Sequence, residues 1–233
     1  MAQRLTMTGN AAAALGAKLA RVEVIATYPI TPQSPIVEYL SEYVADGELK
    51  AELVNTESEH TAMSACIGAS LCGARVFTAT SSQGLVLMHE MLHWAGGART
   101  PVVMAVANRA LAVPWNLYTD HQDSVSQRDT GWIQLYCENN QDVLDTAIQA
   151  YRIAEDRRVL LPIMYCLDGF LLSHTAERVE APEQDFVDEF LPPYKPDFFY
   201  IDPDHPLAEN VVVMPDWYME FRYQQEEAMK NAK

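Results

Sequence analysis

The sequence predicts an α/β fold, a doubly wound parallel sheet with helices on both faces. From residue 9 to about residue 169, short apolar segments alternate with segments whose apolar residues recur at helical spacing. Alternating strands and helices are typical of a parallel sheet, because each crossover runs through a helix. The apolar segments are continuous, which indicates strands that are covered on both faces.

The strands of this sheet are expected where short apolar runs end in polar or turn-forming residues. They are predicted at residues 22–25, 51–54, 75–79, 101–106 and 159–165. In folds of this class, ligands bind beyond the carboxyl ends of the strands. The segments that follow the strands are therefore the first places to search for a site. They are residues 28–33, 55–60, 80–83, 108–123 and 168–174.

The helices between these strands are indicated by composition, spacing and end signals. They are predicted at residues 11–20, 35–45, 57–71, 84–94 and 141–154. The first is rich in alanine, the best helix former, and Thr8 or Asn10 can cap it. The third is built from small residues and ends near Gly73, as expected for glycine beyond a helix.

The composition changes near residue 178, which predicts a domain at 1–178 and a C-terminal arm at 179–233. Residues 180–233 carry 13 acidic and 4 basic residues and 7 of the 13 prolines, which argues against an independent core. Its aromatic residues include Tyr194, Phe198, Phe199, Tyr200, Trp217, Tyr218 and Phe221. Because so many aromatics are unusual in a disordered tail, we expect an extended arm that wraps a partner or leads to another domain.

Charge and cysteine content argue against several classes of function. The net charge of -16 would repel phosphate backbones, so nucleic-acid binding is not expected. No apolar run approaches the roughly 18 residues of a membrane span, and the first residues lack the apolar run of a signal peptide. A cytoplasmic location is therefore expected. The four cysteines form no C-x-x-C pair or cluster, which argues against an iron–sulfur cluster in this chain.

Polar residues after the predicted strands supply the candidate site. Pro29 and Pro32 stiffen a loop that carries Thr31. The loop, YPITP at residues 28–32, is also interpreted more simply as an ordinary rigid turn. Glu57 and Glu59 lie in the segment that opens a helix, where the helix dipole favours acids. The small residues that follow Glu59 leave room for a flat ligand or simply allow tight packing. Arg109 is a natural cation for a carboxylate in an acidic chain, or else a surface arginine.

Histidines raise two weaker alternatives. His121 lies in a polar loop, where it is a candidate base or metal ligand, but more commonly a residue that stabilises the loop by hydrogen bonding. The segment HEMLH at residues 89–93 matches the H-E-x-x-H pattern of zinc hydrolases. The third histidine of the extended pattern does not follow. We therefore interpret the match as coincidence, with histidines that serve helix packing, and expect no metal site in this chain.

Taken together, the strand-end segments resemble the alpha subunit of the 2-oxoacid:ferredoxin oxidoreductases, the pyruvate:ferredoxin oxidoreductase superfamily. The matching stretches, in chain order from residue 9 to about residue 175, are GNAAAALGA, YPITPQSP, ESEHTA, TSSQGLVLM, NRA…DHQDS…RDTGW, and LDGF with a nearby SH. The tail segments FLPPYKP and MPDWYMEFRYQ resemble the linker of such subunits. Six motifs that occur in the expected order form a far more specific signal than any one motif alone.

The resemblance implies a domain that binds the pyrimidine ring of thiamine diphosphate. It assigns Glu59 to that ring, where a glutamate assists removal of the C2 proton of the cofactor, and it assigns Pro29 to the cofactor site. Arg109 and Thr31 match residues that hold the carboxylate and the keto oxygen of a 2-oxoacid. The reaction implied is an oxidative decarboxylation in which coenzyme A accepts the acyl group.

The same resemblance implies partner subunits, because the Gly-Asp-Gly…Asn motif that holds diphosphate and Mg²⁺ is absent from this sequence. A beta-type subunit is expected to supply it. Gamma-type and ferredoxin-like subunits are expected to carry [4Fe-4S] clusters, and ferredoxin or another acceptor to take the electrons. Pyruvate is the first substrate expected, with 2-oxoisovalerate and phenylglyoxylate as alternatives. The remaining alternatives are half of another thiamine enzyme, a zinc hydrolase and a non-catalytic assembly subunit.

Overall fold

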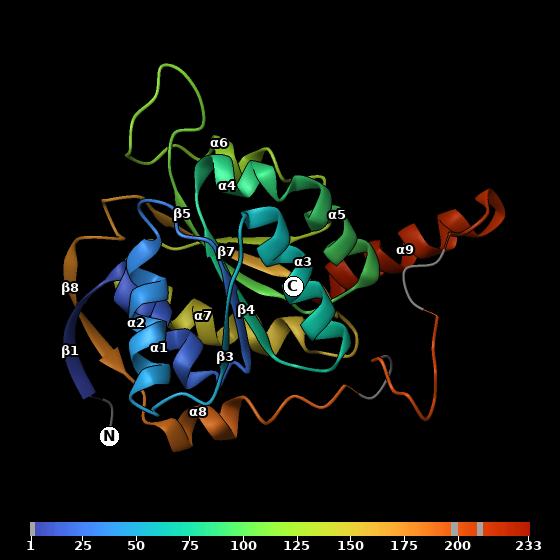
Figure 1. The fold of residues 1–233 in the computed structure, drawn as a ribbon, viewed down its shortest axis with the longest axis horizontal. Helices are drawn as coiled ribbons and strands as arrows, with labels where there is room; N and C mark the ends of the chain where they lie inside the picture. The colour runs from blue at the N-terminus through green and yellow to red at the C-terminus, as the bar shows by residue number, and fades with distance from the viewer. Residues whose placement is uncertain (1–2, 197–199, 209–211) are drawn as a thin grey trace.

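A six-stranded parallel sheet forms the centre of the computed structural model, which describes residues 3–196, 200–208 and 212–233 (Figure 1). Its strands are β2 (Val24–Thr27), β3 (Glu52–Asn55), β4 (Val76–Thr80), β5 (Val103–Asn108), β6 (Ile133–Tyr136) and β7 (Ile163–Asp168). Their order is β3-β2-β4-β5-β7-β6, and every neighbouring pair is parallel. The winding reverses between β2 and β4, which confirms the predicted doubly wound fold.

Helices cover both faces of the sheet (Figure 1). The helices are α1 (Gly9–Leu19), α2 (Ser34–Ala45), α3 (Glu59–Leu71), α4 (Ser82–Leu87), α5 (His89–Ala98), α6 (Gln122–Val125), α7 (Asn140–Ala154), α8 (Gln184–Phe190) and α9 (Pro215–Asn231). Buried residues of α1, α2 and α7 form one hydrophobic core with the sheet, and buried residues of α3, α4 and α5 form another.

Strand β5 illustrates why continuous apolar runs predicted strands that are covered on both faces. Val103, Ala105 and Ala107 belong to the core under α1 and α7, whereas Met104 and Val106 belong to the core under α3 and α5. All five residues are 0% exposed. Since successive side chains of a strand point to opposite faces, both sets of side chains must be apolar. The sequence of the strand therefore shows no alternation of polar and apolar residues.

Some elements differ from the sequence-based expectation. Strand β1 (Gln3–Thr8) pairs antiparallel with β8 (Ala176–Ala181), and β6 forms an edge of the main sheet. These partly exposed strands lack a continuous apolar run and were not predicted. The helix expected at 84–94 is divided at Met88 into α4 and α5. The strand expected from residue 159 begins at Ile163, because Leu160 has a left-handed backbone with φ of 44°.

The C-terminal segment is anchored to the body of the domain. The buried Arg75 guanidinium donates to the main-chain oxygen of Pro192 at 2.9 Å and holds Glu155 through two hydrogen bonds, of 2.6 and 2.7 Å. Further along, Gln225 of α9 donates from Nε2 to the main-chain oxygen of Gly96 at 3.1 Å. The chain after residue 190 is therefore held at two points that lie far apart in the sequence.

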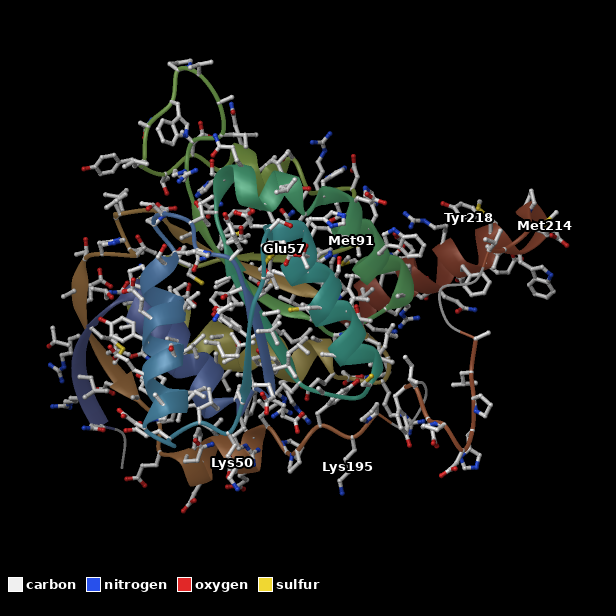
Figure 2. All side chains as sticks on the ribbon, viewed as in Figure 1. Lys50, Glu57, Met91, Lys195, Met214 and Tyr218 are labelled. Carbon is white, nitrogen blue, oxygen red and sulfur yellow. The ribbon has the colours of Figure 1, made fainter. Side chains whose placement is uncertain are left out.

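The expected extended arm is found only in part. Residues 191–196 and 200–208 are irregular, but residues 215–231 form α9, which projects from the body at Met214 and Tyr218 (Figure 2). Pro215 at the first helical turn suits a helix start, because its missing N–H would be unpaired there. The aromatic residues 198 and 199 lie outside the described residues. The division at 178 stays a prediction, and β8 runs across it.

Among the described helices, none combines the length and the hydropathy that crossing a bilayer requires.

Candidate active site

Three loops meet at the carboxyl edge of the sheet, where β2, β4 and β5 end side by side. Because β4 lies between β2 and β5, the loops that follow these strands are neighbours despite their distance in the sequence. Arg109 donates from Nη1 to the main-chain oxygen of Thr31 and from Nη2 to Oε1 of Gln83 at 2.6 Å. The fold thus brings together Thr31 and Arg109, two residues that the sequence selected as site candidates.

Glu59 is the first residue of α3 and points into the protein. Ser58 caps this helix by accepting a hydrogen bond from the main-chain N of Thr61 at 3.2 Å, and a carboxylate in the first turn is favoured by the helix dipole. Glu59 is only 6% exposed. Among the described residues, no hydrogen-bond donor reaches its carboxylate. The carboxylate is therefore free to accept a hydrogen bond from a ligand.

Gly84 lets the Glu59 carboxylate lie against the start of α4. A Cβ at position 84 would stand 2.5 Å from Oε1 of Glu59 and 2.5 Å from Oγ1 of Thr80, which is too close for any side chain. The Thr80 hydroxyl is buried and has no hydrogen-bond partner among the described residues. The Glu59 carboxylate and the unpartnered Thr80 hydroxyl therefore border one spot, and a ring with N–H donors and nitrogen acceptors has the chemistry to pair with them.

The Arg109 guanidinium is the cation of this edge. The residue is 6% exposed, and burial lowers its pKa, an effect that the negative charges of Asp123 and Glu59 oppose. Its Nε is buried without a hydrogen-bond partner in the described part of the chain. The ring of Trp115 lies 5.2 Å from the guanidinium carbon. N–H groups thus remain that can bind an anion such as a carboxylate.

Asp123 fixes the backbone beneath Arg109. Its fully buried carboxylate accepts hydrogen bonds from four donors. These are the main-chain N of Ser82 at 2.9 Å, of Arg109 at 3.1 Å and of Ser124 at 2.8 Å, and Nδ2 of Asn108 at 2.7 Å. Burial raises the pKa of the Asp123 carboxyl, while these hydrogen bonds lower it. One carboxylate thereby joins the ends of β4 and β5 to α6.

Sequence reasoning missed Gln83, Gly84 and Asp123 as site residues. All three lie in or beside the strand-end segments that it selected. Gln83 and Gly84 come soon after the buried strand β4, which was the available signal for them, whereas Asp123 lies 15 residues beyond the end of β5 and carried no such signal. Pro29 and Glu57 are exposed at this edge of the protein (Figure 2 labels Glu57).

His121 acts as a hydrogen-bonding residue of its loop. Its Nε2 lies 2.9 Å from Oδ1 of Asp168, and its ring packs 5.2 Å from the ring of Tyr136. Both contacts tie the loop after β5 to the ends of β7 and β6. The structure therefore favours the stabilising interpretation of His121.

The HEMLH segment lies on α5. The rings of His89 and His93 stand perpendicular with centroids 4.9 Å apart, and Nδ1 of His89 lies 2.6 Å from Oε1 of Gln127. Both histidines are exposed, so the expectation that they serve helix packing is wrong. Glu90 faces His60, with 3.7 Å between Oε2 and Nε2.

We predict that this histidine pair binds no catalytic zinc, because catalytic zinc normally takes three protein ligands. Among the described residues, no group of three or more His, Cys, Asp or Glu side chains is arranged to hold a metal. Elemental analysis of the purified protein should find zinc well below one atom per chain. Stoichiometric zinc that is lost in both His89→Gln and His93→Gln would contradict the prediction.

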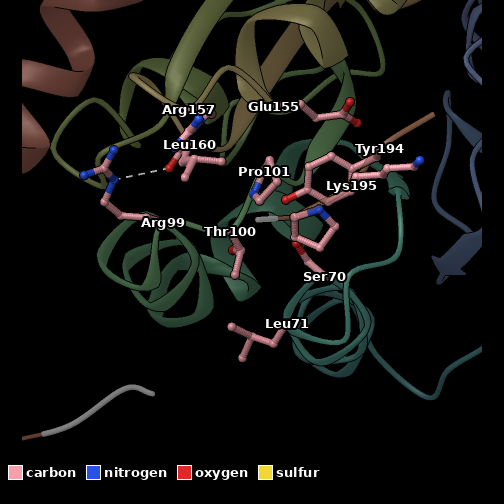
Figure 3. Close-up of a pocket in the computed structure, with 11 residues that line it drawn as sticks. Ser70, Leu71, Arg99, Thr100, Pro101, Glu155, Arg157, Leu160, Tyr194 and Lys195 are labelled. Carbon is pink, nitrogen blue, oxygen red and sulfur yellow. Dashed lines mark hydrogen bonds between the residues drawn. The ribbon is translucent and has the colours of Figure 1, made fainter. Parts of the chain in front are cut away.

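Two hollows lie at the other edge of the sheet. A cavity of about 20 Å³ is lined by Leu71, Pro101, Leu160 and Tyr194 among others (Figure 3), and it has room for about one water. A larger hollow of about 470 Å³ borders Lys18, Arg21, Lys50 and Tyr194. Pro101 and Leu160 precede β5 and β7, so the first cavity is at the amino ends of the strands. Neither hollow includes Glu59 or Arg109.

Sequence comparison finds relatives along the whole chain. The family model described as pyruvate flavodoxin/ferredoxin oxidoreductase, thiamine-diphosphate-binding, matches residues 15–233. Pyruvate synthase subunit PorA of Methanocaldococcus jannaschii is 60% identical over 100% of this chain and 60% of that protein. Ketoisovalerate oxidoreductase subunit VorA of Pyrococcus furiosus is 53% identical over 99% of this chain and 58% of that protein. This chain thus spans about three-fifths of the length of these relatives.

Solved structures share the fold. A 2-oxoglutarate:ferredoxin oxidoreductase from Magnetococcus marinus, with 2-oxoglutarate, coenzyme A and succinyl-CoA bound, matches with a TM-score of 0.78 and 21% identity. The match covers 98% of this chain and 45% of that chain. A thiamine-diphosphate-dependent enzyme from Mycobacterium smegmatis, described as putative, matches 70% of this chain with a TM-score of 0.55. At these identities the likeness establishes the fold alone.

Proposed function

This chain belongs to the thiamine-diphosphate-binding family of pyruvate flavodoxin/ferredoxin oxidoreductases, and we propose that it binds the pyrimidine ring of that cofactor. The enzyme would be a 2-oxoacid:acceptor oxidoreductase that converts a 2-oxoacid to acyl-CoA and CO₂. The observation that carries the proposal is the buried Glu59 carboxylate, which no described donor satisfies and which lies at the same sheet edge as Arg109. Both groups are needed, one for the cofactor and one for the substrate.

Glu59 is proposed to accept a hydrogen bond from the pyrimidine ring and to exchange a proton with it. Its position beside Gly84 and Thr80 supports this role, because the residue is mostly buried and its carboxylate lies against the start of α4. When bound, thiamine diphosphate supplies a nucleophilic carbon and takes up the electron pair that decarboxylation releases. A carboxylate suits the task since it both accepts and returns a proton.

Arg109 is proposed to hold the carboxylate of the 2-oxoacid, and Thr31 to meet its keto oxygen. The guanidinium is buried and keeps N–H groups free for an anion. In an acidic protein, such a cation is needed to hold an anionic substrate against the overall charge. Pro29 is proposed to border the cofactor from the same loop.

Partner subunits complete the proposal. A beta-type subunit would hold the diphosphate and Mg²⁺, and gamma-type and ferredoxin-like subunits would carry the [4Fe-4S] clusters that pass electrons to ferredoxin or another acceptor. Coenzyme A would take the acyl group. The names of the relatives, which are oxidoreductase subunits, support a complex of this kind. A cytoplasmic location also stays a prediction.

Pyruvate is the substrate that we propose first. The relatives named pyruvate synthase reach 60% identity, against 53% for those named ketoisovalerate oxidoreductase, so 2-oxoisovalerate is the closest alternative, followed by phenylglyoxylate. Arg109 provides one cation, and the loop at residues 28–32 carries no other. A 2-oxoacid with a single carboxylate and a neutral side group therefore fits the proposed pocket.

We expect kcat/KM of the assembled complex to be highest for pyruvate among pyruvate, 2-oxoisovalerate, phenylglyoxylate and oxalate. Arg109→Met should lower kcat/KM about 10- to 100-fold for the preferred substrate, because a hydrogen-bonded ion contact of about 1.5–3 kcal/mol is lost. Steady-state kinetics with each substrate is the measurement. Oxalate as the best substrate, or unchanged kinetics in Arg109→Met, would refute the assignment of Arg109.

A further inference from the structure

Gln83 links the start of α4 to the loop after β5 through one side chain. It lies in the first turn of α4, directly after β4, and the residue is exposed. Its Oε1 accepts a hydrogen bond from Nη2 of Arg109 at 2.6 Å. Its Nε2 donates to the main-chain oxygen of Leu111. A side chain with both ends bonded has little freedom to move.

The backbone that presents Gln83 is itself unusual. Ser82 has a φ of 47°, a left-handed conformation that residues other than glycine rarely adopt. Two contacts hold it there: its main-chain N donates to Asp123 at 2.9 Å, and its hydroxyl donates to the main-chain oxygen of Ala110 at 2.7 Å. Such conformations persist only where the surroundings enforce them, and they cluster at functional sites.

The consequence for Arg109 is a guanidinium with a fixed orientation. The main-chain oxygen of Thr31 binds Nη1 and Gln83 binds Nη2, while Nε has no partner among the described residues. The Thr31 contact is made by the backbone and the Trp115 ring faces the guanidinium at 5.2 Å, so Gln83 is the side chain whose hydrogen bond to the guanidinium a substitution can remove. An arginine that is oriented before its ligand arrives loses less freedom on binding.

We propose that Gln83 is a positioning residue for the substrate, which holds the Arg109 guanidinium ready for the carboxylate of a 2-oxoacid. This inference rests on the proposed function. The amide matters because it accepts a hydrogen bond from the cation without neutralising it. A carboxylate at position 83 would pair with Arg109 and compete with the substrate.

The test compares Gln83→Met, Gln83→Glu and Gln149→Met in the complete complex. Gln149 is an exposed residue of α7 and serves as the matched control. KM for the 2-oxoacid should rise about tenfold in Gln83→Met, the size expected from losing one hydrogen bond to a charged group, and further in Gln83→Glu. The dissociation constant of thiamine diphosphate, measured by fluorescence titration, should stay at the wild-type value in all three. Gln83→Glu has nearly the shape of the original side chain, so it preserves the test if Gln83→Met fails to assemble.

The possible outcomes distinguish the role of Gln83 from the proposed function of the protein. An active wild-type complex with unchanged KM in Gln83→Met and Gln83→Glu would overturn the role of Gln83 alone. Variants that lose kcat and cofactor affinity together, with KM unchanged, would also overturn it, because they would indicate a merely structural role. A wild-type complex without turnover of any 2-oxoacid would overturn the proposed function, and this inference with it.

Discussion

Glu59→Gln is expected to lower turnover of the assembled complex by about 10²- to 10⁴-fold, the range for loss of a group that transfers a proton. Glutamine has the same shape as glutamate, so the packing against Gly84 and Thr80 should persist. A neutral amide cannot take up and return a proton as a carboxylate does. Steady-state turnover with the best 2-oxoacid measures the loss, while circular dichroism and gel filtration check folding and assembly.

Glu57→Gln is the matched control for this prediction. Glu57 lies two residues earlier, before the same helix, but it is exposed where Glu59 is buried. Its substitution should leave turnover near the wild-type value. A Glu59→Gln complex that turns over as fast as wild type would refute the assignment of Glu59.

Arg75→Met is expected to lower the free energy of unfolding by about 3–5 kcal/mol, because it leaves a buried carboxylate unpaired. The side chains of Arg75 and Glu155 are 3% and 10% exposed. Arg75 also donates to the main-chain oxygens of Ala20 at 2.6 Å and of Pro192 at 2.9 Å. Burial raises the pKa of the Glu155 carboxyl, and Arg75 lowers it. Substitution of the arginine therefore removes the charge that stabilises the ionised carboxylate. Urea denaturation of the purified chain measures the change.

Two controls make this prediction specific. The double variant Arg75→Met/Glu155→Leu should recover part of the lost stability, since it replaces a buried ion pair with apolar groups. Arg158→Met should change stability much less, because the Arg158 side chain is 73% exposed in its pair with Asp156. An Arg75→Met chain that is as stable as Arg158→Met would contradict the account of the buried pair.

The parallel sheet could be predicted from the sequence because its central strands are buried on both faces. β4 and β5 are buried along their whole length, and most of their residues are apolar, which marks them as strands without polar alternation. β1 and β8 pair across more than 160 residues and are partly exposed, so no local pattern marks their pairing. The break at Met88 and the turn at Leu160 likewise depend on tertiary contacts, which the spacing of apolar residues along the sequence does not reveal.

The location of the candidate site could be predicted in outline because ligands of this fold class bind beyond the carboxyl ends of strands. Glu59, Thr31 and Arg109 were selected on that basis and lie at that edge. The roles of Gln83 and Asp123 could not be predicted, because they arise from contacts between loops. Asp123 binds the main chain of Ser82, 41 residues earlier, and only the order of β4 and β5 in the sheet brings the two together.

Hydrogen–deuterium exchange at the thiazolium C2 of thiamine diphosphate, bound to the assembled complex, tests the central claim most directly. Acid quenching followed by NMR gives the exchange rate without any contribution from electron transfer or coenzyme A. Wild type and Glu57→Gln should exchange fast, and Glu59→Gln should exchange about 10²- to 10⁴-fold more slowly with the cofactor still bound. A Glu59→Gln complex that binds the cofactor and exchanges at the wild-type rate would contradict the role of Glu59 in activating it.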